Sequence, residues 1–139
     1  MSYDHNVYPE PPNKVTKVVH HSPFEWTKEM ARFFLQNGVL IEKLVVGLPI
    51  YGHRFTLSNK RNHSLGAPAE PNWKVSGSFI GKYSEIFSTL KIIKHALDYS
   101  EVCMKVKNDG WKKEMTKDGP LAYKDDQLVC YDDPNQTYL

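Results

Sequence analysis

The stretch Lys43–Leu57, KLVVGLPIYGHRFTL, joins a run of apolar residues to a polar turn and a second short run. Leu44–Leu48 carries no polar side chain, a pattern typical of a strand that is covered on both faces of a parallel sheet. After the turn, Phe55–Leu57 predicts a second, half-exposed strand. The stretch therefore predicts an α/β protein whose regular alternation stops near Arg54.

An amphipathic helix is predicted before this stretch. Ser22 suits a helix cap, Pro23 suits the first helical position, and Glu25 lies three residues after the cap, as in a capping box. Asn37-Gly38 predicts the end of the helix. One apolar stripe recurs at helical spacing between these signals and consists of Trp26, Met30, Phe33 and Phe34.

The chain after Leu57 has a different pattern of polar and apolar residues. Residues 58–70 form a polar stretch with glycine and proline and predict a surface loop. Near the end of the chain, two strand-like runs, 121–124 and 127–131, flank Asp125-Asp126 and predict a β-hairpin. Asp132-Asp133-Pro134 predicts the start of a further helix.

Composition excludes several classes of partner. The 139 residues carry a formal charge of +2, with 18 basic residues scattered among 16 acidic ones, so nucleic acid is not an expected partner. No apolar run is long enough to span a membrane, and the N-terminus has no signal-peptide pattern. Cys103 and Cys130 lack the spacing of a zinc site and are expected to be two buried thiols, with a bond between them as the alternative.

Met1-Ser2-Tyr3-Asp4 and the run from Lys43 to Gly52 together resemble the chitinases of glycoside hydrolase family 18. In that family a strand Met-x-Tyr-Asp and a later strand Leu-x-x-Gly-x-Pro-x-Tyr-Gly line the sugar cleft of a (β/α)8 barrel. The resemblance implies a partial TIM barrel, its sixth and seventh strands, with an α+β insertion domain. The implied divisions are a barrel segment at 1–52, the insertion domain at 53–131 and the start of the next barrel helix at 132–139.

The resemblance also implies roles for five residues. Tyr3 and Asp4 would be catalytic, with Tyr3 holding the acetamide oxygen of the sugar for attack and Asp4 accepting hydrogen bonds across the scissile bond. Met1, Tyr51 and His53 would bind substrate. Because histidine changes charge between roughly pH 5 and pH 8, His53 predicts pH-dependent sugar binding.

The catalytic acid of the family is not found in this sequence. Members hydrolyse β-1,4-linked N-acetylglucosamine polymers with retention, and the acetamide group of the substrate is the nucleophile. A glutamate at the end of an Asp-x-x-Asp-x-Asp-x-Glu run donates the proton, and the chain has no such run. The resemblance therefore implies an inactive fragment that needs the remainder of the barrel, and neither a cofactor nor a metal is expected.

Several segments depart from the pattern of the family. Val75 stands where a sugar-facing glutamate is usual, Leu128 where a tryptophan is usual and Cys130 where a glycine is usual. Residues 81–97 have no counterpart. Their apolar spacing predicts an amphipathic helix running into Tyr99, and the alternative is a retained intron in the gene sequence.

Three functions are compatible with these residues. The first is part of a secreted, extracellular chitinase, with chitin or N-acetylglucosamine oligosaccharides as partners. The second is a chitinase-like lectin that binds the same sugars without hydrolysis. The third is an unrelated α+β module. A glutamate closing the acidic run would indicate the hydrolase, and a glutamine or leucine in its place would indicate the lectin.

Overall fold

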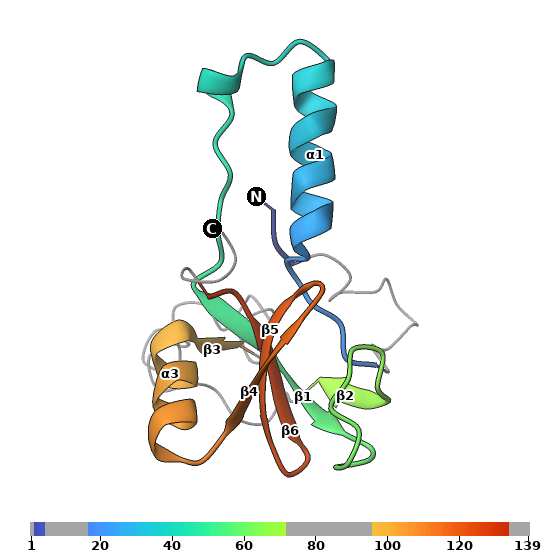
Figure 1. Ribbon diagram of the computed structural model, residues 1–139, viewed down its shortest axis with the longest axis vertical. Coiled ribbons are helices and arrows are strands. Elements are labelled where there is room, and N and C mark those ends of the chain that lie inside the picture. Colours follow the sequence, from blue (N-terminus) through green and yellow to red (C-terminus); the bar gives the residue numbers. More distant parts are fainter. Residues whose placement is uncertain (1, 5–16, 72–95, 134–139) are drawn as a thin grey trace, which may run out of the picture.

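A computed structural model describes residues 2–4, 17–71 and 96–133. The sheet forms one end of the molecule, and helix α1, Phe24–Gln36, projects from it (Figure 1). The chain then turns back through a short 3-10 helix, Ile41–Lys43, and descends beside α1 to the sheet. No helix within the described ranges is long and apolar enough to cross a membrane.

The sheet has six strands, and every pairing in it is antiparallel. Its main order is β2-β1-β6-β5-β4. β3 pairs with the first three residues of β1 and β2 with the last three, so both lie along the same edge of β1. The strands are β1 Tyr51–Leu57, β2 Ala69–Pro71, β3 Ala96–Asp98, β4 Lys112–Thr116, β5 Gly119–Lys124 and β6 Gln127–Tyr131.

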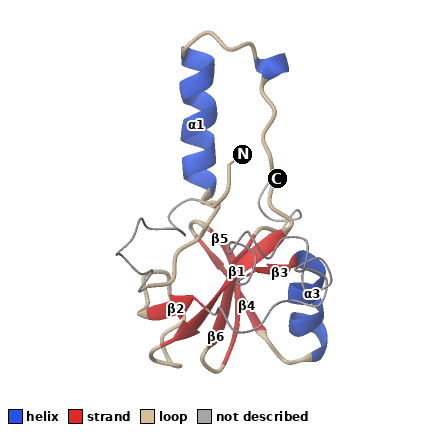
Figure 2. Ribbon diagram, turned by 180° about the vertical axis from the view of Figure 1, so that it is seen from behind, coloured by secondary structure: helices blue, strands red, loops and turns tan. Residues whose placement is uncertain are grey.

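Two apolar clusters cover the two faces of this sheet. Alternate residues of β6 divide between them: Leu128 and Cys130 belong to one cluster, and Val129 and Tyr131 belong to the other. Helix α3, Tyr99–Asn108, covers the second face and contributes Val102. Figure 2 shows α3 at one side of the sheet and β2 at the opposite side. The central strands are therefore held from both faces.

Gly52 is required where β1 meets β6. A Cβ atom at this position would lie 2.6 Å from the carbonyl oxygen of Cys130 and 2.7 Å from the Cβ of Tyr131. Such contacts are far inside van der Waals distance, so any larger residue forces the two strands apart. Gly52 therefore fixes the separation of the strands next to Tyr51 and His53.

The predicted helix is present as α1, but its cap differs. Pro23 is the N-cap, and no side chain caps the helix. The Ser22 hydroxyl instead donates a hydrogen bond to the carbonyl of Ser2 at 3.1 Å. A tertiary contact has therefore replaced the predicted local one. At the other end Asn37 is the C-cap and Gly38 adopts φ +87°, as predicted for a helix stop.

The predicted helix over residues 81–97 is wrong at its C-terminal end, because Ala96 and Leu97 are in β3 and pair with His53 and Gly52. Residues 81–95 lie outside the described part of the chain. Helix α3 begins at Tyr99, where Asp98 accepts from the Glu101 backbone N–H and Glu101 accepts from the Asp98 backbone N–H. This capping box terminates the strand and starts α3.

The prediction of a strand at Leu44–Leu48 with both faces buried is also wrong for this chain. The segment is extended but outside any strand, and Val45 is 87% exposed. A strand of a parallel sheet needs paired strands beside it, and no strand among the described residues pairs with this segment; the Ser2 hydroxyl donates to the carbonyl of Gly47. Residues 2–4 are likewise outside any strand. The predicted half-exposed strand at 55–57 is part of β1 and is mostly buried.

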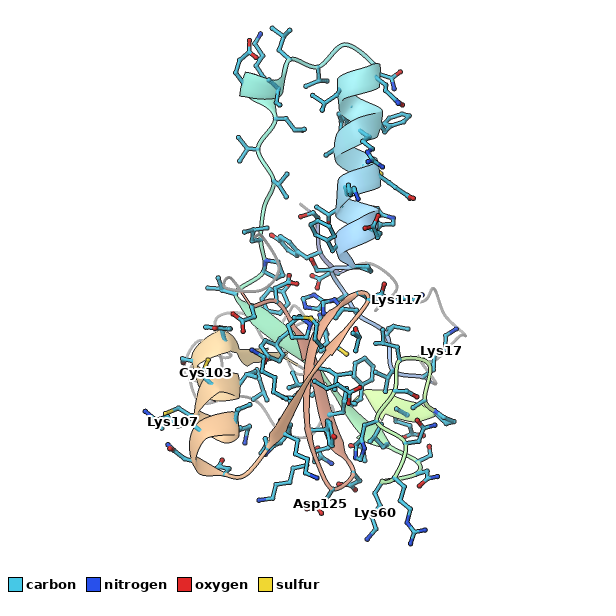
Figure 3. The ribbon with its side chains drawn as sticks, viewed as in Figure 1. Lys17, Lys60, Cys103, Lys107, Lys117 and Asp125 are labelled. Carbon is cyan, nitrogen blue, oxygen red and sulfur yellow. The ribbon has the colours of Figure 1, made fainter. Side chains whose placement is uncertain are left out.

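The C-terminal hairpin is confirmed as β5 and β6. Lys124 pairs with Gln127 across the Asp125-Asp126 turn, and Asp125 adopts φ +53°, which aspartate tolerates in tight turns. The predicted loop 58–70 contains the start of β2. Neither cysteine is in a disulfide; Cys130 is buried as expected, but Cys103 is exposed on α3 (Figure 3).

A matched pair of substitutions tests this distribution of burial. Val129→Ala removes two carbon atoms from a fully buried position, and we expect a loss of about 2 kcal/mol in the free energy of unfolding. Val45→Ala removes the same atoms from an exposed position and should change it by less than about 0.5 kcal/mol. Urea denaturation of both variants measures the difference. Equal effects would contradict the arrangement described here.

Candidate functional site

The carboxylate of Asp4 is the centre of a cluster at the start of β1. The Tyr51 hydroxyl donates a hydrogen bond to Asp4 Oδ2 at 2.8 Å. His53 Nε2 lies 2.9 Å from Asp4 Oδ1, and His21 Nδ1 lies 3.4 Å from the same oxygen. Three segments that are distant in sequence therefore meet at one side chain.

Each segment places its residue by local structure. Tyr51 and His53 are two positions apart on β1, so both point to the same face of the strand. His21 lies just before α1, in the turn where Ser22 is bound to Ser2. Asp4 has φ +64°, a conformation that is uncommon outside glycine and that marks functional sites when surrounding contacts hold it.

Aromatic rings pack around the carboxylate. The rings of Tyr3 and Tyr51 meet edge to face with centroids 6.1 Å apart. His21 stacks on Tyr51 at 5.2 Å and meets His53 edge to face at 4.5 Å. Tyr3, Asp4 and Tyr51 are only half-buried, whereas His21 and His53 are fully buried beneath them. The accessible face of the cluster is therefore formed by the two tyrosines and the carboxylate.

The carboxylate of Asp4 is ionised at neutral pH. Burial alone would raise the pKa of Asp4, but its contacts with His21, His53 and Tyr51 outweigh burial and hold this pKa well below its usual range. Burial lowers the pKa of His21 to about 4, although the contact with Asp4 opposes the shift. At pH 7 an ionised carboxylate thus lies against a neutral imidazole.

His20, the neighbour of His21, fixes the position of this segment. His20 Nδ1 accepts a hydrogen bond from the Ser22 backbone at 3.2 Å, which leaves its Nε2 to donate to the Tyr131 carbonyl at 3.1 Å. Gly119, with φ +136°, packs so closely that an added Cβ would lie 2.5 Å from His20 Nε2. The segment before α1 is thereby fixed to β5 and β6.

Four of the five predicted site residues come together here. Tyr3, Asp4, Tyr51 and His53 form one cluster, whereas Met1 lies outside the described residues. His53 was expected to bind substrate, but its side chain is buried and contacts Asp4. Sequence analysis assigned no role to His21. The His20-His21 pair just before a predicted helix start could have indicated a functional residue there.

Comparison with known proteins identifies the family. The model for glycosyl hydrolases family 18 matches residues 1–138. The chain belongs to glycosyl hydrolase family 18. Among its relatives is the probable chitinase 10 of Drosophila melanogaster, 30% identical over 97% of this chain but only 6% of the relative. The endochitinase of Manduca sexta is 35% identical over 75% of the chain and 18% of the relative.

Solved structures of the family confirm the fold class. A family 18 chitinase from Cycas revoluta, solved in complex with (GlcNAc)4, superposes with a TM-score of 0.72 at 24% identity. The match covers 99% of this chain and 35% of that one. Catalytic domain 2 of the Ostrinia furnacalis group II chitinase gives a TM-score of 0.71 at 26% identity over 96% and 34%. The family 18 fold of this chain is therefore part of the barrel with an α+β insertion.

Asp132 should make the folding stability of the chain depend on pH. Its carboxylate is buried with no hydrogen-bond partner in the described part of the chain, whereas Asp133 beside it is paired with Lys113. Burial raises the pKa of Asp132 to about 6, and Ser22 offsets part of the shift. Between about pH 4 and pH 6 the folded chain therefore holds more protons than the unfolded chain, so this group lowers stability as pH rises.

Asp132→Asn removes that titration. We expect the stability gain of the variant over the parent to grow from near zero at pH 4 to about 3 kcal/mol at pH 7. Urea denaturation across this range measures the difference. Asp126→Asn, in the exposed hairpin turn, is the control and should change stability by no more than about 0.5 kcal/mol. A gain that does not vary with pH would be the contradicting result.

Proposed function

We propose that this chain contributes the acceptor-side wall of a cleft that binds β-1,4-linked N-acetylglucosamine oligosaccharides. The observation that carries the proposal is the convergence of Tyr3, Asp4 and Tyr51 on one accessible face. Aromatic rings beside a fixed carboxylate offer the apolar and hydrogen-bonding surfaces that a sugar presents in alternation. The Cycas revoluta relative solved with (GlcNAc)4 supports this ligand class.

Each residue has a separate role in this proposal. Asp4, ionised at neutral pH, accepts hydrogen bonds from sugar hydroxyl or amide groups. Tyr3 holds the acetamide oxygen for attack on the anomeric carbon, and Tyr51 both orients Asp4 and offers its ring to the sugar. His53 is a positioning residue, because it is buried and contacts Asp4. Residues 1–52 would belong to the barrel and 53–131 to the wall-forming insertion domain.

The complete reaction would be hydrolysis with retention, assisted by the acetamide group of the substrate. Its proton donor must come from residues outside this sequence, because no Asp-x-x-Asp-x-Asp-x-Glu run occurs in the 139 residues. The parent protein would then act on extracellular chitin. A binding role without hydrolysis is the second candidate, because the 139 residues contain no acidic run of that kind.

Titration of the chain with (GlcNAc)4 by calorimetry tests sugar binding. Tyr51→Phe removes only the hydroxyl that binds Asp4, and we expect about tenfold weaker binding because a charge-assisted hydrogen bond is lost. Tyr123→Phe is the matched control on β5, where the ring stacks on His63, and should leave affinity unchanged. Equal affinities for the parent and Tyr51→Phe would argue against this face as the sugar site.

Turnover of a fluorogenic chitobioside tests whether this chain needs a proton donor from outside its sequence. The isolated chain should show no turnover above the uncatalysed background, because the residues described here position the sugar and none donates the proton. Release of fluorophore that saturates with substrate and disappears in Asp4→Asn would instead mean that this chain holds a complete active site.

A further inference from the structure

Three potential metal ligands come together in the cluster. Asp4 Oδ1, His21 Nδ1 and His53 Nε2 all lie within 4.8 Å of one another. Two of the separations are 2.9 Å and 3.4 Å. Ligands of a tetrahedral zinc ion are about 3.3 Å apart, given Zn–N and Zn–O bonds of roughly 2.0–2.1 Å. Asp4 Oδ1 is therefore already spaced from each imidazole nitrogen as one ligand is from the next around one ion, and the two nitrogens lie within 4.8 Å of each other.

His21 supplies an independent observation. Its side chain is 0% exposed, and neither ring nitrogen has a hydrogen-bond partner among the residues that the structure describes. Buried polar side-chain atoms nearly always have such a partner, so this ring needs an explanation. Its Nδ1 points at the Asp4 carboxylate at 3.4 Å without hydrogen-bond geometry, which leaves a lone pair available for a cation.

We propose that Asp4, His21 and His53 bind one divalent transition-metal ion, with Zn²⁺ as the best fit. Two imidazoles and one carboxylate form a borderline donor set that suits zinc and is poorly suited to Mg²⁺ or Ca²⁺, which prefer oxygen ligands. Three protein ligands leave a fourth position for water. The sequence predicted no metal. The three ligands are far apart in the sequence and come together only in the folded chain.

The surroundings of the cluster also suit a metal. The Tyr51 hydroxyl donates to Asp4 Oδ2, the oxygen that faces away from both histidines, and so orients the carboxylate as an outer-shell partner would. On binding, the His53 Nε2 proton moves to Nδ1 or to solvent, so that Nε2 offers its lone pair to the ion. The ion would join residues 2–4, the segment before α1 and β1, which in its absence meet through hydrogen bonds and ring contacts.

Cobalt and zinc titrations of the full chain test the proposal without any sugar. After treatment with a chelator and dialysis, Co²⁺ should produce intense visible absorption that saturates at one ion per chain, as expected for four-coordinate cobalt. One equivalent of Zn²⁺ should abolish it. Absence of a saturable spectrum, or an end point well above one equivalent, would overturn the assignment.

Substitutions locate the ion. His21→Asn should weaken Co²⁺ binding by about 100-fold or more, because losing a ligand costs more than losing an outer-shell partner. His63→Asn, at a half-buried histidine that stacks on Tyr123 away from the cluster, is the matched control and should bind like the parent. Loss of binding in His63→Asn, or unchanged binding in both His21→Asn and Asp4→Asn, would refute the site.

Imidazole ¹⁵N signals of the unmodified chain give a readout that does not depend on a variant folding. Addition of Zn²⁺ should move one ring nitrogen of His21 and one of His53 strongly upfield, while those of His63 stay in place. Shifts confined to other histidines would contradict the proposal even if one ion binds.

Discussion

The carboxylate of Asp4 is the contact on which the arrangement of the site depends. Residues 2–4 have no ladder pairing with the sheet, so their position is set by the bonds from Tyr51 and His53 to Asp4 and by Ser2. These bonds connect residues 47 and 49 positions apart. The left-handed backbone of Asp4 is stable only while such partners hold it. Removing the carboxylate would therefore release Tyr3 as well.

Strand β1, which carries Tyr51 and His53, is held rigidly in the sheet. β1 pairs on both edges, its Gly52 allows close contact with β6, and apolar clusters cover both faces of the sheet. In contrast, α1 and the extended segment after it expose large apolar side chains, including Phe33 and Val45. A closed barrel would bury those faces. The chain matches about a third of the length of each solved family member. The sheet fixes Tyr51 and His53 on β1, and residues 2–4 and His21 come to them from outside the sheet.

Local signals predicted local structure well. The Asn37-Gly38 stop of α1 and the Asp125-Asp126 hairpin turn depend on residues close in sequence, and both are present. The Ser22 cap failed because its hydroxyl bonds to Ser2, and the Leu44–Leu48 strand failed because strand formation depends on neighbours that this segment does not have here. For the site, the family resemblance selected Tyr3, Asp4 and Tyr51, and the structure places these three residues in one cluster. It missed His21, whose contact with Asp4 arises only when the chain folds.

Both buried histidines contact the charge that organises the cluster: His53 is hydrogen-bonded to Asp4, and the proposed ion would join the carboxylate to both rings. The most direct test is the titration of Asp4 itself, followed through its side-chain carboxyl ¹³C signal in metal-free protein. The contacts described here predict that Asp4 stays ionised far below its ordinary pKa of 3.8, and that Tyr51→Phe moves this pKa upward. A midpoint at the ordinary value, unaffected by Tyr51→Phe, would show that the carboxylate is not held by this cluster.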